Sequence, residues 1–78
     1  MSAPADSSRE IAIRGESIEL AQLLKFAGVV DTGGAAKHVI GAGQVALNGA
    51  VELRRSRAVV PGDRVTYAGT TLVVRAAR

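Results

Sequence analysis

Three arginines lie within four positions of the chain, at Arg54, Arg55 and Arg57. A guanidinium group presents N–H donors in a fixed fork, so it can bind two oxygens of one phosphate through charge-assisted hydrogen bonds. The cluster therefore predicts a polyanionic partner. A solvated loop could carry the same residues, because basic runs often serve only solubility, so charge alone leaves both interpretations open.

Positive charge is concentrated in the later part of the chain. The 78 residues have a formal net charge of +3 and a pI near 10.2. Residues 1–19 carry two basic and four acidic side chains, a net of −2, whereas residues 20–78 carry eight basic and three acidic ones, a net of +5. The part that must hold the arginines is therefore more basic than the total indicates.

Other kinds of site lack the residues that they need. His38 is the only histidine and there is no cysteine, so neither a metal site nor any other cofactor is predicted. No sequence neighbour would orient His38 as a base for nucleophilic catalysis. Gly33-Gly34 and Gly41-Ala42-Gly43 lack the strand-before, helix-after context of a nucleotide-binding fingerprint. We expect a protein that is not an enzyme.

Cysteine usage and hydropathy predict a cytoplasmic protein. A small fold without disulfides suits a reducing compartment. No apolar run approaches the roughly 20 residues that cross a bilayer, and the first eight residues resemble no signal peptide. We expect no membrane association, a disordered tail over residues 1–10 and a single domain over residues 11–78.

Two short helices are predicted before the arginines. The first has one apolar face with the spacing i, i+3, i+4, i+7, formed by Leu20, Leu23, Leu24 and Ala27. Gly28 follows at the usual position of a C-terminal glycine. The second begins after Asp31 or Thr32, both good N-caps, and carries Lys37 and His38 on its outer side. Its inner face is Ala36, Val39 and Ile40.

Strands follow from Gln44 onward, where the apolar period changes to two. Asn48-Gly49 predicts a type I′ hairpin turn, because both positions of that turn need φ > 0. A second reversal is predicted at Pro61-Gly62-Asp63, strands at 64–67 and 71–75, and a short edge strand at 11–14. Val45 and Leu47 point to one face, and Val51 and Leu53 continue the apolar pattern after the turn. The candidate inward residues of the last two strands are Val65, Tyr67, Leu72 and Val74.

Aromatic residues limit how such a protein could bind nucleic acid. Phe26 and Tyr67 are the only aromatics, and both lie in patterns that indicate the core. Base stacking on an aromatic platform is therefore not expected. Many cations with few rings favour contacts to phosphates and backbone shape, as in the recognition of structured RNA.

In the order of its parts, the chain resembles the RNA-binding domain named after ribosomal small-subunit protein S-four, also called the alpha-L motif. Four segments between residues 18 and 62 carry the resemblance: Ile18 to Lys25, Gly34 to Ile40, Gly43 to Gly49, and Val60 to Asp63. Gly-Gly-x-Ala-Lys and Val51 to Arg55 look most like the small stand-alone bacterial members. The resemblance implies an α+β fold, two short helices packed on a small, mainly antiparallel sheet, and binding to structured RNA, often ribosomal.

The family's RNA-binding face lies on the second helix and the hairpin after it. Carried over residue by residue, the resemblance implies an RNA-binding set of Thr32, Lys37, His38, Gln44, Asn48, Arg54, Arg55 and Arg57. Many members have an arginine where this chain has Gly33, so one phosphate anchor is missing. Many also have an aspartate where this chain has Ala21, so a capping interaction at the first helix is absent. The turn alone would explain Asn48.

The expected function is non-enzymatic binding to ribosomal or transfer RNA by a monomer, in association with translation and the ribosome. The alternative is a small adaptor whose basic surface meets an acidic protein. Such an adaptor should also expose an apolar patch, whereas every apolar stripe here is expected in the core. A fragment of an RNA-modifying enzyme is disfavoured, because the chain begins with its own methionine.

Overall fold

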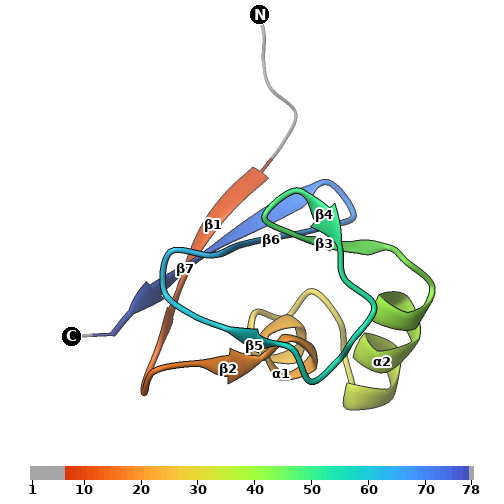
Figure 1. Cartoon of the computed structure of the whole chain (residues 1–78), viewed down its shortest axis with the longest axis horizontal. Helices are drawn as coiled ribbons and strands as arrows, with labels where there is room; N and C mark the ends of the chain where they lie inside the picture. The colour runs from red at the N-terminus through yellow and green to blue at the C-terminus, as the bar shows by residue number, and fades with distance from the viewer. Residues whose placement is uncertain (1–6, 78) are drawn as a thin grey trace, which may run out of the picture.

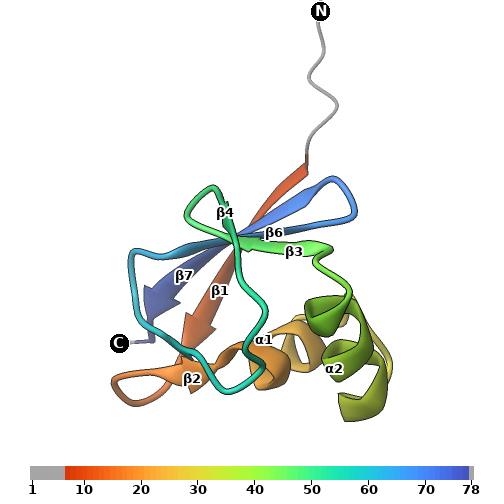
Figure 2. The same cartoon turned by 45° about the vertical axis from the view of Figure 1, so that its right-hand side comes forward.

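The computed structural model describes residues 7–77, which form a five-stranded sheet, a two-stranded sheet and two helices. The elements in chain order are β1 Ser7–Ile13, β2 Ile18–Glu19, α1 Leu20–Phe26, α2 Gly33–Gly41, β3 Val45–Leu47, β4 Ala50–Val51, β5 Ala58–Val59, β6 Arg64–Tyr67 and β7 Thr70–Ala76. The larger sheet has the order β1-β7-β6-β3-β4, and β2 pairs with β5. Both helices lie on the same side of the larger sheet (Figures 1 and 2).

The predicted fold class is confirmed. All strand pairs are antiparallel except β1 with β7, so the sheet is mainly antiparallel within the described residues. The helices pack against each other and against the sheet through one cluster of buried aliphatic side chains. Neither helix in residues 7–77 has the length and apolar character needed to cross a membrane.

Strand β1 is longer than its sequence indicates. It begins at Ser7, so the predicted disordered tail is wrong for residues 7–10, and the rest of that tail, residues 1–6, lies outside the described residues. Every residue of β1 pairs with β7, from Ser7 opposite Thr70 to Ile13 opposite Ala76. Backbone groups of β7 form these hydrogen bonds with β1. Such bonds form without alternating apolar residues in β1, so the sequence pattern of β1 does not reveal them.

Both helices begin and end where local sequence predicts. The inner faces of α1 and α2 are buried as expected. Gly28 has φ +77°, the left-handed conformation of a residue that follows a helix. The Thr32 hydroxyl oxygen accepts a hydrogen bond of 3.0 Å from the Ala35 N–H, so Thr32 is the N-cap of α2.

The turns and strands after α2 also follow the prediction over most of their length. Asn48 has φ +53° and Gly49 has φ +87°, as the type I′ turn requires. The inward positions Val45, Leu47, Val65, Leu72 and Val74 are all buried, and Tyr67 packs partly buried against them. The short pair β2–β5 has no counterpart in the predicted strands.

Three apolar residues expected in the core lie at the surface instead. Phe26 is 62% exposed, Val51 62% and Leu53 60%. Successive residues of a helix are rotated by about 100°, which places Phe26 outside the stripe that Ala27 continues. β4 ends at Val51, so the chain leaves the sheet before Leu53 and the inward alternation does not continue. The expectation that every apolar stripe lies in the core is therefore wrong.

Candidate nucleic-acid interface

Backbone contacts hold the segment 52–57, hereafter the arginine loop, against the start of α1. The Leu20 N–H donates to the Arg57 carbonyl oxygen at 2.9 Å, and the Ala21 N–H donates to the Arg55 carbonyl oxygen at 3.1 Å. Glu19, at the N-cap, makes no side-chain capping bond. The loop thus satisfies N–H groups that would otherwise be unpaired at the helix start. Its position depends on the backbone, and alanine substitutions of the arginines would retain these bonds.

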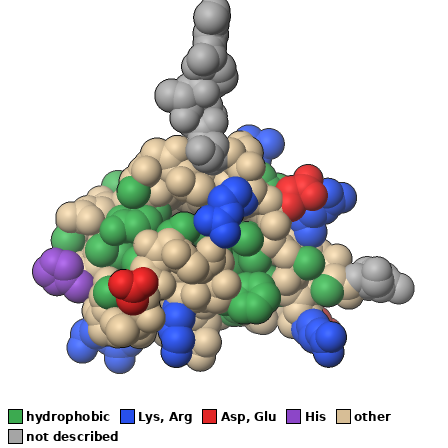
Figure 3. Space-filling view, turned by 180° about the vertical axis from the view of Figure 1, so that it is seen from behind, with side chains coloured by type: hydrophobic (Ala, Val, Ile, Leu, Met, Phe, Trp, Pro, Cys, Tyr) green, Lys and Arg blue, Asp and Glu red, His purple; other side chains and the backbone are tan. Residues whose placement is uncertain are grey.

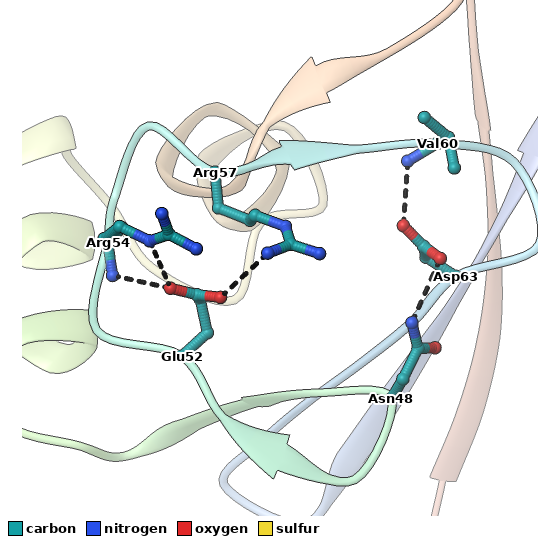
Figure 4. A network of polar contacts seen from close by, with 6 residues as sticks. All are labelled: Asn48, Glu52, Arg54, Arg57, Val60 and Asp63. Carbon is teal, nitrogen blue, oxygen red and sulfur yellow. Dashed lines mark hydrogen bonds and ion pairs between the residues drawn. The ribbon is translucent and has the colours of Figure 1, made fainter.

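A shared carboxylate orients two of the three arginines (Figure 4). Glu52 Oε2 accepts hydrogen bonds from the Arg54 backbone N–H at 3.1 Å and from Arg54 Nε at 3.2 Å. Arg57 Nη1 lies 3.6 Å from Glu52 Oε1. The bond from the Arg54 backbone N–H, reinforced by the Arg54 side chain, holds the pKa of Glu52 below its ordinary value of 4.5. Glu52 is therefore ionised at neutral pH, and the arginine loop has three positive charges and one negative charge, a net of +2.

The outer side of α2 meets the arginine loop at a shallow depression of about 430 Å³, hereafter the helix–loop depression. Its lining is Lys37, Gly41, Leu53, Arg54, Arg55 and Ser56. The structure therefore places Lys37 beside Arg54 and Arg55, which are far from it in sequence. Side chains of the second helix and of the arginine-bearing segment therefore line one surface.

A second depression, of about 330 Å³, lies between the helices and is hereafter the interhelical depression. It is lined by Glu19, Ala21, Gln22, Lys25, Gly33, Gly34, Lys37 and Arg55. Lys37 and Arg55 thus line both depressions. Four cations from α1, α2 and the loop, Lys25, Lys37, Arg54 and Arg55, line this double hollow.

Asn48 has a structural role in the turns. Its Nδ2 donates to Asp63 Oδ1 at 3.1 Å, and its Oδ1 accepts from the Arg64 N–H at 2.9 Å. Asp63 Oδ2 in turn accepts from the Val60 N–H at 3.0 Å (Figure 4). The Asn48 amide therefore ties the hairpin turn to the Pro61–Asp63 turn.

Comparison with known proteins assigns the chain to a family. A family model described as the S4 domain matches residues 11–75. This chain belongs to the S4 domain family. The chain is 42% identical over 57 residues to the Escherichia coli (strain K12) protein named "Putative RNA-binding protein YbcJ". The match covers 73% of this chain and 81% of that protein. The same values hold for the uncharacterized protein YbcJ of Shigella flexneri.

Solved structures share the fold of this S4 domain. The solution structure of Escherichia coli YbcJ, described as having an αL motif involved in RNA binding, matches with a TM-score of 0.62 and 37% identity, over 97% of this chain and 92% of that one. The trimeric structure of Vibrio cholerae heat shock protein 15 matches with a TM-score of 0.69 and 22% identity, over 81% of this chain and 67% of that one. The αL fold is therefore confirmed. Because the S4 domain is a non-enzymatic fold, the prediction that this is not an enzyme is confirmed as well.

The other residues predicted to bind RNA have different surroundings in the structure. His38 is exposed on α2 and lines a further hollow with Gly34, Lys37, Gly41 and Ala42. The Thr32 hydroxyl caps α2, and Gln44 is exposed directly before β3. Arg57 lies against Glu52. The structure thus brings Lys37, Arg54 and Arg55 together on one surface, while the Arg57 guanidinium faces a carboxylate.

Sequence reasoning did not include Lys25 and Gln22 of α1 in the site. Both line the interhelical depression beside Lys37 and Arg55. Their spacing of three residues on the outer side of the predicted helix could have indicated a shared face. Lys25 supplies a positive charge to the depression where many family members have an arginine and this chain has Gly33. A Cβ at Gly33 would meet no atom within 4 Å, so there is free space beside the Gly33 backbone.

Proposed function

We propose that this S4 domain binds structured RNA, with ribosomal or transfer RNA as the target, and that it works in the cytoplasm in association with translation. The observation that carries the proposal is the convergence of Lys25, Lys37, Arg54 and Arg55 on two adjoining depressions. The description of Escherichia coli YbcJ as an RNA-binding protein supports it.

Three of these cations are available for phosphate without losing a partner first. Among the ion pairs formed within residues 7–77, none engages Lys25, Lys37 or Arg55. Arg54 gives its Nε to Glu52, which leaves its two terminal nitrogens to face a phosphate. The positive end of the α2 dipole adds to the same field, since Gly33 and Gly34 line the interhelical depression.

A surface of this kind predicts salt-sensitive binding that follows backbone shape. Each phosphate neutralised by a cation releases counterions, so affinity falls as salt rises. The base edges of an A-form duplex face a deep, narrow major groove that side chains do not enter, so a protein contacts mainly the RNA backbone. We therefore infer that Lys37 and Arg55 hold phosphates across the junction of α2 and the arginine loop.

An electrophoretic titration tests this function. The intact chain is mixed with transfer RNA and with ribosomal RNA fragments at low and high salt, beside the variant with Arg54, Arg55 and Arg57 all replaced by alanine. We expect a shift at low salt that weakens at high salt and in the variant. The variant keeps the carbonyl oxygens that cap α1, so circular dichroism should show it folded. No shift at low salt, or equal binding by the folded variant, would contradict the proposal.

Exposed apolar side chains favour a second candidate function, an adaptor that binds an acidic protein. Figure 3 shows hydrophobic side chains between the cations on the face opposite to that of Figure 1, and Phe26, Val51 and Leu53 are the most exposed large apolar residues among those described. Competition decides between the functions. Poly-glutamate and unlabelled RNA of equal charge are compared as competitors for the protein bound to labelled RNA. If both displace the protein at equal concentrations, the adaptor function is favoured.

The oligomeric state is proposed to be monomeric. The Vibrio cholerae structure is trimeric, but at 22% identity the likeness concerns the fold alone. Light scattering on the free protein and on its RNA complex measures the state directly. A mass of one chain is expected for the free protein, and a mass of one chain plus the RNA for the complex.

A further inference from the structure

Leu53 lies in a place unusual for an exposed leucine. It is 60% exposed and lines the helix–loop depression, whose other large side chains are Lys37, Arg54 and Arg55. Isolated apolar residues are common on protein surfaces and need no explanation. Here the apolar side chain forms part of a basic hollow, so the cations and the leucine would face the same ligand.

Val51 extends this apolar surface. A Cβ built on Gly43 would lie 3.9 Å from Leu53 Cδ2 and 3.9 Å from Val51 Cγ1, so the two side chains lie next to each other above the backbone of Gly43. Val51 is 62% exposed and ends β4, an edge strand of the sheet. The structure thus has an apolar platform of two side chains, continuous with the cationic wall.

The helix–loop depression has room beside this platform. Gly41 forms part of its lining without a side chain, and a Cβ there would meet no atom within 4 Å. Its volume of about 430 Å³ falls in the range of about 300–1,000 Å³ that small ligands occupy. A matching ligand group combines negative charge with a flat apolar surface. A nucleotide whose base is not stacked in a helix has both properties.

We propose that Leu53, supported by Val51, contacts the face of an unpaired base whose neighbouring phosphates are held by Lys37, Arg54 and Arg55. The inference rests on the proposed RNA-binding function and specifies its substrate. The preferred RNA has an unpaired nucleotide, such as a bulge or a junction, next to a helical segment. A continuous duplex keeps its bases stacked and cannot present a base face to Leu53.

Two hairpin RNAs that differ only in one bulged adenosine test the inference, by fluorescence anisotropy at constant salt. We expect the intact chain to prefer the bulged RNA. Leu53→Ala should lower the affinity for the bulged RNA about three- to tenfold, since it removes part of an apolar contact, and should leave the duplex affinity unchanged. Leu53→Phe should strengthen binding to the bulged RNA, because an aromatic ring stacks on a base better than an aliphatic chain does.

Val60→Ala is the matched control. Val60 is also an exposed aliphatic residue, at 43%, and Figure 4 shows it beside Asp63, in a different group of polar contacts from Arg54. Its truncation should change neither affinity. Melting temperatures of Leu53→Ala and Val60→Ala should match that of the intact chain, because neither side chain belongs to the buried cluster.

Each other result overturns a defined part of the reasoning. Equal affinity of the intact chain for both RNAs, or equal loss for both RNAs in Leu53→Ala, overturns the base contact and leaves the RNA-binding function standing. A change of mass in Leu53→Ala with unchanged RNA binding assigns Leu53 to a contact between copies of the chain and overturns the inference. Binding of neither RNA at low salt contradicts the proposed function itself.

Discussion

The salt dependence of RNA binding offers a quantitative test of the interface, through Lys37 and Arg55. Four cations line the two depressions: Lys25, Lys37, Arg54 and Arg55. Each phosphate contact contributes about −0.7 to −0.9 to the slope of log affinity against log salt, so four contacts predict a slope of roughly −2.8 to −3.6. A fourfold rise in salt should then weaken binding about 50- to 150-fold.

Removing single cations should change this slope stepwise. Arg55→Ala should reduce its magnitude by about 0.7 to 0.9, and the double variant with Lys37→Ala by about 1.4 to 1.8. Neither residue has an ion-pair partner within residues 7–77, so no intramolecular contact offsets the loss. Arg57→Ala should have a smaller effect, since Arg57 already lies against Glu52.

Arg75→Ala serves as the control for charge alone. Arg75 lies near the end of β7, pairs with Glu10 at 2.8 Å, and belongs to a strand whose end is remote from α2 in Figures 1 and 2. The assay is fluorescence anisotropy of a labelled bulged hairpin at several potassium chloride concentrations, with folding checked by circular dichroism. A slope that Arg55→Ala leaves unchanged, or that Arg75→Ala reduces as much, would refute the assignment of the interface.

Three further predictions concern the residues that shape the site. Asn48→Ala should lower the free energy of unfolding in urea by about 1–3 kcal/mol, through two lost hydrogen bonds and strain at φ +53°; Asn48→Gly should cost less, because glycine accepts that φ. RNA affinity of the folded variants should be unchanged. Thr32→Ala should cost about 1 kcal/mol by removing the cap of α2, and Thr32→Ser should restore it; equal unfolding curves for both would contradict the capping role. The lowered pKa of Glu52 means that its stabilising contribution is complete above its ordinary value of 4.5 and is lost as the pH falls through the lower folded-state value. Urea unfolding should therefore show that the free energy of unfolding falls more between about pH 7 and about pH 3 for the intact chain than for Glu52→Gln. An equal fall in both proteins would show that the Glu52 contacts contribute nothing to stability.

Elements governed by neighbours in the sequence were predictable. The apolar spacing of α1 and α2, the Thr32 cap and the positive φ of Asn48 and Gly49 all depend on interactions within a few residues. These elements, in their order, also carried the resemblance to the S4 domain, and with it the fold. The basic character of the surface followed from composition, because charged side chains remain at the surface of a small domain.

Tertiary contacts decided the rest of the fold. β1 extends to Ser7 because β7 offers it a seven-residue edge, and a strand's own sequence does not describe its partner. Val51 and Leu53 share the apolar character of Val45 and Leu47, but the sheet ends at β4 and leaves them exposed. Burial depends on what lies across from a residue, and periodicity carries no such information.

The composition of the site was decided in the same way. Three arginines in four positions are chemically alike in the sequence, yet Glu52 takes up Arg54 Nε and lies against Arg57, while Arg55 lies beside Lys37. Lys25 joins them because the packing of α1 on α2 brings its outer side to the same hollow. The kind of ligand follows from residue types that the sequence displays. The particular side chains that share it are set by distances through space, which only the packed fold defines.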